Sequence, residues 1–273
     1  MPIKTSFLTE DDLRKLPLPN HGKKYAVVPH GTIIDKTREE LALAGFDIES
    51  EQYKTSLDGQ IAQGTYRLTY GTDADMGLMF AWSNSYNKMM RFKCAIGAQV
   101  FVCMNGVVHG DLGNYNRKHI GANALADVFT TINSQISKAK EYYDKLVEDK
   151  EMLKNVTLTT RDKGRILGEL FAHDEILTLT QVGIVKREID KPSFVYNAGI
   201  DSAWTMYNHI TLALKESHPM NFIDDHQKVH SYFVDQYGKL ITTQIVEEAA
   251  GPPVVTTTTK KIVKPSYLGV NFL

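Results

Sequence analysis

The first half of the chain alternates hydrophobic and polar residues with a period of two. Tyr66, Leu68 and Tyr70 keep this spacing, which places their side chains on one face of a β-strand. The Asp58-Gly59 pair before them is typical of a hairpin turn. The same reasoning predicts a mainly antiparallel sheet, with strands at residues 25–29, 46–55, 60–70, 78–83 and 92–104.

Two short helices are expected among these strands. Thr9 precedes three acidic residues, a pattern typical of a helix N-cap. Pro17 would end the helix that starts there, because proline lacks an N–H group. A second helix at residues 37–44 would end at Gly45, since glycine adopts the left-handed conformation that follows many helices.

From residue 122 the hydrophobic period changes to three or four residues, which predicts one amphipathic helix of about 25–30 residues. Its apolar positions are Leu125, Val128, Phe129, Ile132, Ile136, Ala139, Tyr143 and Leu146. More helices are expected at residues 160–172, 177–188, 202–216 and 222–237. The expected fold class is α+β: an N-terminal antiparallel β-sheet module with an early helix (1–121), then the long amphipathic helix and a helical C-terminal half packed on the sheet (122–248).

Residues 249–273 are rich in Pro, Thr and Lys and predict an extended tail. The prolines at 252, 253 and 265 prevent a continuous helix. The apolar end, from Tyr267 to Leu273, is costly to leave in water. We therefore expect the tail to dock on a neighbouring subunit, which would make the protein a homo-oligomer.

Composition excludes few functions. The chain has 273 residues, of which 42% are hydrophobic and 23% charged, so it can bury a substantial core. Its net charge of -1 gives no overall attraction to nucleic acid or membranes. Both cysteines, Cys94 and Cys103, lie in β-like segments, which favours buried thiols and an intracellular protein. No run approaches the roughly 20 apolar residues of a membrane span, so we expect a soluble protein of the cytoplasm, or of the host cytoplasm if a phage encodes it.

Local charge differs from the total. Between residues 60 and 120 there are six cations and three aspartates, with no glutamate; the cations are Arg67, Lys88, Arg91, Lys93, Arg117 and Lys118. Aromatic residues lie between them, and Tyr66, Trp82 and Tyr86 are the candidates to stack on bases. Cations that contact phosphates and aromatic faces that stack on bases together form a single-strand binding groove. The alternative is that the aromatic residues form sheet core and the cations a solvated face, because strands favour aromatic residues for packing alone.

Metal and catalytic motifs are weak. Cys94, Cys103, His109 and His119 could bind zinc, but their spacing matches no close-paired zinc motif. His226 lies four residues before His230 on a predicted helix, without the glutamate of H-E-x-x-H. P-loop, nucleophile-elbow and dinucleotide-binding motifs are absent from the sequence. We therefore expect no metal, no cofactor and no catalytic residue set.

Two sequence blocks resemble a known family. FVCMNGVV followed by NRKHIGANALADVF is similar to the signature of the phage and plasmid proteins catalogued as domain of unknown function nine-three-two, and DSAWTMYNHIT resembles a late helix of that family. The chain departs from it where Lys118-His119-Ile120-Gly121 replaces Arg-His-Thr-Gly. The positions that match the family motif are Cys103, Asn105, His119, Gly121 and Asn208, with Arg117 or Lys118 at the basic position.

The resemblance implies a mobile-element context without a defined activity. The order of a β-rich half and a helical half is also similar in outline to phage single-strand annealing proteins of the RecT, Red-beta and Erf kind. The leading hypothesis is a non-catalytic, phage-type protein that binds single-stranded DNA in recombination or replication. A second is a structural or host-interaction (anti-defence) protein that acts by oligomerising. A third is a hydrolytic or nucleotide-processing enzyme that uses Asn105, Arg117 and His119.

Overall fold

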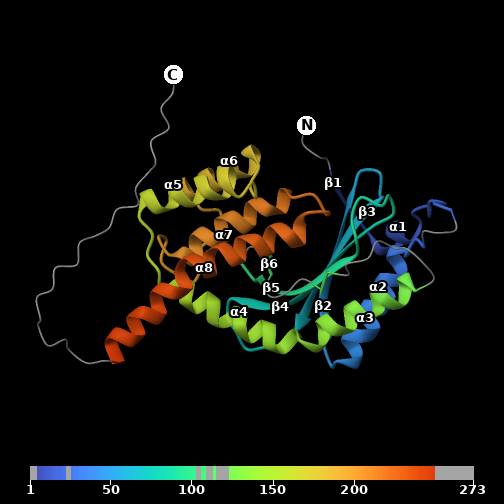
Figure 1. The fold of residues 1–273 in the computed structure, drawn as a ribbon, viewed down its shortest axis with the longest axis horizontal. Helices are drawn as coiled ribbons and strands as arrows, with labels where there is room; N and C mark the ends of the chain where they lie inside the picture. The colour runs from blue at the N-terminus through green and yellow to red at the C-terminus, as the bar shows by residue number, and fades with distance from the viewer. Residues whose placement is uncertain (1–4, 23–25, 103–105, 109–112, 115–122, 250–273) are drawn as a thin grey trace, which may run out of the picture.

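The computed structural model describes residues 5–22, 26–102, 106–108, 113–114 and 123–249 (Figure 1). These residues form an antiparallel sheet followed by helices, which confirms the predicted α+β class. No helix among them is both long and apolar enough to cross a membrane.

Six strands follow one another across the sheet in chain order, each antiparallel to its neighbour. They are β1 (Thr5–Leu8), β2 (Asp47–Ser56), β3 (Ile61–Thr69), β4 (Met76–Ser85), β5 (Lys93–Val100) and β6 (Gly106–Val108). A two-residue strand, β7 (Gly113–Asn114), also pairs with β5. The expected strand at 25–29 is absent from its described part, 26–29, where Pro29 instead precedes a helix.

The turn between β2 and β3 explains the first hairpin. Gly59 has a φ of +66°, a conformation that glycine adopts without strain. Its N–H donates to the Ser56 carbonyl over 2.9 Å, and the Asp58 carboxylate accepts from the N–H of Gln60 over 3.1 Å. The hairpin turn predicted at Asp58-Gly59 is therefore confirmed.

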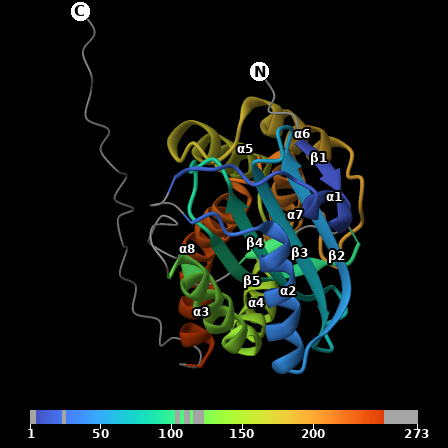
Figure 2. The same ribbon diagram turned by 90° about the vertical axis from the view of Figure 1, so that its right-hand side faces the viewer.

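One face of the sheet, called here the inner face, packs against helices α2 (His30–Leu43), α3 (Ala124–Ser137) and α4 (Ala139–Lys154) (Figure 2). The short helix α1 (Glu10–Arg14) begins as predicted, because the Thr9 hydroxyl accepts from the N–H of Asp12 over 3.2 Å. The second helix is longer than the expected 37–44, since it starts directly after Pro29.

The prediction of one long amphipathic helix was wrong. The backbone of Lys138, with φ -97° and ψ 2°, leaves the helical conformation and separates α3 from α4. The hydrophobic period continues across this break, because Ile136 and Ala139 are both buried. Periodicity alone therefore could not reveal it.

The remaining helices lie mainly on the other side of the sheet (Figure 1). They are α5 (Thr160–Gly168), a π-helical turn (Glu169–His173), α6 (Leu179–Asp190), α7 (Ala203–Ala213), a 3-10 turn (Leu214–Glu216) and α8 (Phe222–Ala249). Helix α8 contacts β4, β5 and β6 as well as α4 and α7. Its first turn covers part of the second face of the sheet, called here the outer face.

Two hydrophobic clusters hold these layers together. The larger contains inner-face residues such as Tyr66 and Trp82 together with Val128 and Ile132 of α3, so it includes residues from both predicted parts of the chain. The smaller lies on the outer face and consists of Met79, Ala81, Ala95, Phe222 and Ile223. The start of α8 is thus fixed to the sheet by apolar packing.

Candidate functional site

The three aromatic residues expected to stack on bases are core residues instead. Tyr66 and Trp82 are fully buried and Tyr86 is 2% exposed. The Trp82 indole N–H donates to the Tyr66 hydroxyl over 3.1 Å, and the Tyr86 ring stacks on His30 at 3.8 Å between centroids. This corrects the stacking prediction: Tyr66 and Trp82 occupy inner-face positions under helices, and none of the three rings presents a face to a ligand.

Three of the predicted cations do come together. Lys88, Arg91 and Lys93 line one hollow of about 340 Å³ at the hairpin between β4 and β5, beside Met220 and Asn221. We call these three residues the basic cluster. Lys88 and Arg91 are exposed. Lys93 is paired with Asp224 at the start of α8.

Arg67 lies outside the basic cluster. Its guanidinium pairs with Glu49 over 2.8 Å and lies 4.3 Å from the centre of the Phe101 ring. With its charge compensated in this way, Arg67 is a structural cation on the outer face of the sheet.

Most of the family-motif positions lie outside the described residues: Cys103, Asn105, Arg117, Lys118, His119 and Gly121. Asn208 is described and fully buried in α7, where its side-chain amide donates to the Trp204 carbonyl over 2.9 Å. It therefore stabilises its own helix in this structure.

The histidine pair on α8 does not converge. His230 lies 3.2 Å from the Asp149 carboxylate, whereas His226 lines a pocket on the sheet. Within the described ranges there is no group of three side chains that could hold a metal ion. Burial raises the pKa of the Cys94 thiol well above its usual value, which keeps the sulfur neutral.

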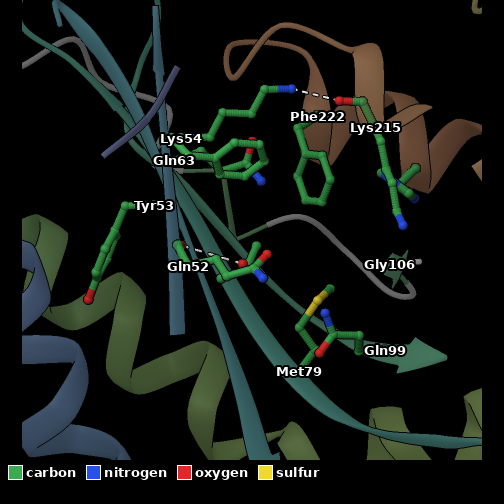
Figure 3. A pocket seen from close by; sticks show the side chains of 12 residues that line it. Gln52, Tyr53, Lys54, Gln63, Met79, Gln99, Gly106, Lys215 and Phe222 are labelled. Atoms are coloured by element: carbon green, nitrogen blue, oxygen red, sulfur yellow. Dashed lines mark hydrogen bonds between the residues drawn. The ribbon is translucent and has the colours of Figure 1, made fainter. Parts of the chain in front are cut away.

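A second hollow, of about 270 Å³, lies on the outer face and is called here the amide pocket (Figure 3). Alternate positions of β2, β3 and β5 supply its floor, while the 3-10 turn and α8 supply its cover. The side chain of Tyr53 points away from it (Figure 3). The lining residues that matter most are Gln52, Lys54, Gln63, Gln99, Phe222 and His226.

Lys54 ties the floor of the amide pocket to its cover. Its ammonium donates to the carbonyls of Lys215 over 2.7 Å and Ser217 over 2.9 Å. Burial lowers the pKa of Lys54, against an opposing attraction from Glu216. This contact joins residues 161 positions apart in the chain and fixes the pocket's width.

Two buried polar side chains in the amide pocket are unsatisfied. The side-chain carbonyl oxygen of Gln63 has no hydrogen-bond partner, and of the two ring nitrogens of His226 only one interacts with a neighbour, the Gly106 backbone, in a contact of poor geometry. His226 is fully buried and Gln63 is 6% exposed. Burial lowers the pKa of His226 to about 3, with a smaller opposing effect of the Gly106 backbone, so the imidazole is neutral at pH 7.

Reasoning from the sequence missed the amide pocket. A usable signal was present, because Gln52 and Lys54 on β2 alternate with inner-face residues, as do Gln63 and Thr65 on β3. The 3-10 turn and α8, which cover the amide pocket, could not be predicted from the pattern of the strands.

Comparison with known proteins adds no assignment. No family model, no curated protein and no solved structure matches the chain. The resemblance to the phage and plasmid family therefore stays a prediction.

Proposed function

We propose that the protein binds single-stranded nucleic acid, with the phosphates held by the basic cluster. The observation that carries this proposal is the convergence of Lys88, Arg91 and Lys93 on one hollow. Cations that follow a strand neutralise its phosphates and release counterions, whatever the base sequence. Such binding needs no catalytic group, in agreement with the absence of a catalytic motif in the sequence.

The structure changes the details of the earlier hypothesis. Base stacking by Tyr66, Trp82 and Tyr86 is no longer part of it, because these rings are buried. Lys88 and Arg91 carry the exposed charge, and Lys93 adds a cation whose pairing with Asp224 reduces its effect. A role in phage recombination or replication, a cytoplasmic location and assembly through residues 249–273 belong to the same proposal.

The test is a fluorescence-anisotropy titration of a labelled single-stranded oligonucleotide across a salt series. Binding should weaken with salt, with a slope of about -0.7 for each phosphate contacted. Lys88→Ala combined with Arg91→Ala should weaken binding and reduce the slope by about 1.4, for two lost contacts. Lys186→Ala, at an exposed lysine on α6, is the matched control.

Absence of binding at low salt and micromolar protein would overturn the proposal. If the double variant binds with an unchanged slope, the phosphates contact a different surface of the protein. If the oligonucleotide does not bind at all, the structural or host-interaction hypothesis becomes the better one.

A further inference from the structure

We propose that the amide pocket receives a single nucleobase of a nucleotide unit. The inference rests on the proposed function for its claim that a strand supplies this unit, and it adds base recognition to phosphate binding. A free nucleotide presents the same chemistry, so the test below separates the two sources.

The carboxamides indicate the class of ligand. Gln52, Gln63 and Gln99 project into one space from three different strands (Figure 3). A carboxamide carries donors and an acceptor in one plane, which matches the edge of a base. Among the described residues that line the pocket there is no carboxylate.

The unsatisfied buried atoms indicate which polar groups a ligand of this pocket would present. Buried polar groups in folded proteins nearly always have a hydrogen-bond partner. In the amide pocket, the Gln63 carbonyl oxygen has none, and the imidazole of His226 has only a contact of poor geometry with the Gly106 backbone, which leaves its other nitrogen unsatisfied. The oxygen needs a donor, and a neutral imidazole offers one donor and one acceptor. With the imidazole donor directed at Gly106, the Gln63 oxygen and the remaining imidazole nitrogen both accept, and the exocyclic amino group of a base supplies the donors they need.

The remaining walls suit a flat ring. Phe222 provides an aromatic side chain from α8, and Met79 adds an apolar surface from β4 (Figure 3). The Phe222 ring lies 4.5 Å from the His226 ring, between centroids. Aromatic side chains stack on the exposed faces of unpaired bases.

Size and charge limit what enters. A volume of about 270 Å³ falls just below the range of roughly 300–1,000 Å³ for pockets that enclose drug-sized ligands. The base therefore fits inside while its sugar and phosphate stay at the mouth. Lys54 and Lys215 both line the pocket, and their positive charges favour a ligand that carries a phosphate.

The amide pocket and the basic cluster share one segment of the chain. Met220 and Asn221 line the basic cluster, and Phe222 and His226 line the amide pocket. The smaller hydrophobic cluster fixes this segment to the sheet through Phe222 and Ile223. A strand that contacts the basic cluster therefore passes close to the pocket.

The experiment is an isothermal titration of the full chain with each of the four nucleoside 5′-monophosphates. At least one should bind, and Gln63→Met should weaken that binding about tenfold by removing one hydrogen-bonding edge at nearly constant volume. Gln99→Met is the second variant, in case the first fails to fold, and melting curves check both. Gln236→Met, at an exposed glutamine on α8, should leave binding unchanged.

Lack of binding by all four nucleotides, or binding that neither pocket variant weakens, would overturn the inference.

A competition experiment distinguishes the two sources of the base, a strand and a free nucleotide. A single-stranded oligonucleotide and an abasic one of equal length compete with the bound nucleotide. Displacement by the base-bearing strand alone supports a strand as the source. Oligonucleotide binding that needs Lys88 and Arg91 but not Gln63 leaves the proposed function standing and removes the base pocket. Nucleotide binding without any oligonucleotide binding would leave the base pocket standing and remove the proposed function.

Discussion

Gly64 lies directly opposite Trp82 in the pairing of β3 with β4, and the indole ring occupies the space that a side chain at Gly64 would need. A Cβ atom built on Gly64 would lie 2.5 Å from Cε2 of Trp82. The ring is fixed there because its N–H donates to the Tyr66 hydroxyl over 3.1 Å. This close approach explains how so large a side chain is fully buried under the helices.

Gly64→Ala should therefore destabilise the fold. The added methyl group must displace a hydrogen-bonded ring or the backbone, and such overpacking costs about 1–3 kcal/mol. Urea denaturation of the two proteins measures the difference in the free energy of unfolding.

Gly164→Ala is the control for this change. Gly164 is exposed in α5 and an added Cβ meets no atom within 4 Å, so alanine should stabilise the helix by up to about 1 kcal/mol. Equal effects of the two substitutions would contradict the explanation from the Trp82 ring.

Local signals in the sequence predicted much of the fold. The Asp58-Gly59 turn and the Thr9 cap depend on residues a few positions apart, and both are present. Strand β1 was missed because it is only four residues long and is ordered by pairing with β2, far along the chain. The break at Lys138 was missed because buried Ile136 and Ala139 continue the helical period across it.

The candidate site could be predicted only in part. Clustering of cations along residues 88–93 is a local property, and the structure keeps Lys88, Arg91 and Lys93 together. Strand alternation does not reveal which face a helix will cover, so the sequence left open whether the aromatic residues stack on bases or form sheet core, and the structure places them in the core. The amide pocket joins Lys54 to a carbonyl at Lys215, and no pattern within a strand indicates such a distant partner.

Lys150→Met should cost about 3 kcal/mol of stability, because it leaves a carboxylate that is only 10% exposed without its cation. The Lys150 side chain is 2% exposed and pairs with Asp73 and, over 3.1 Å, with Asp75. Asp75 keeps Lys154 as a partner at 2.5 Å, so the loss falls mainly on Asp73. The free energy of unfolding from urea denaturation checks this.

Lys145→Met on the same helix provides the comparison. Lys145 is half exposed and pairs with Glu148 over 3.1 Å and, at the longer distance of 3.7 Å, with Asp149. Pairs made by an exposed lysine contribute about 0–1 kcal/mol. If the two substitutions cost the same, the ion pairs of Lys150 with the segment before β4 do not stabilise the fold.

Deletion of the residues after Gly251 should convert an oligomer to a smaller species. This prediction rests on the sequence, since residues 250–273 lie outside the described part of the chain, and on the cost of leaving the apolar end in water. Light scattering of both proteins at equal concentration measures the mass. An unchanged oligomer, or a monomer before and after deletion, would show that the tail holds no assembly together.

His226 should make the fold less stable as the pH falls. Burial lowers the pKa of His226 to about 3, with smaller contributions of the same sign from Lys215 and Lys54, while a histidine in an unfolded chain has a pKa near 6.5. Between these values the unfolded chain binds a proton that the folded protein does not. The free energy of unfolding therefore decreases as the pH falls below 6.5, by at most about 1.4 kcal/mol per pH unit for this group.

The variant His226→Leu removes this proton uptake. The free energy of unfolding of the variant, relative to wild type, should rise by about 2 kcal/mol as the pH falls from 7 to 4.5. Urea denaturation at several pH values measures this difference. Burial also raises the pKa of the neighbouring Asp225 to about 6, so that the folded protein binds a proton there and gains stability as the pH falls below 6. Since both proteins keep Asp225, its effect is expected largely to cancel in the difference.

The control for the pH series is His173→Asn, at a side chain that is 86% exposed. Its stability should follow the wild-type curve at every pH. If His226→Leu also runs parallel to wild type, the imidazole takes up a proton in the folded state. It would then be a cation facing the amide pocket, and a carboxylate or phosphate would be the expected ligand at that position in place of the edge of a neutral base.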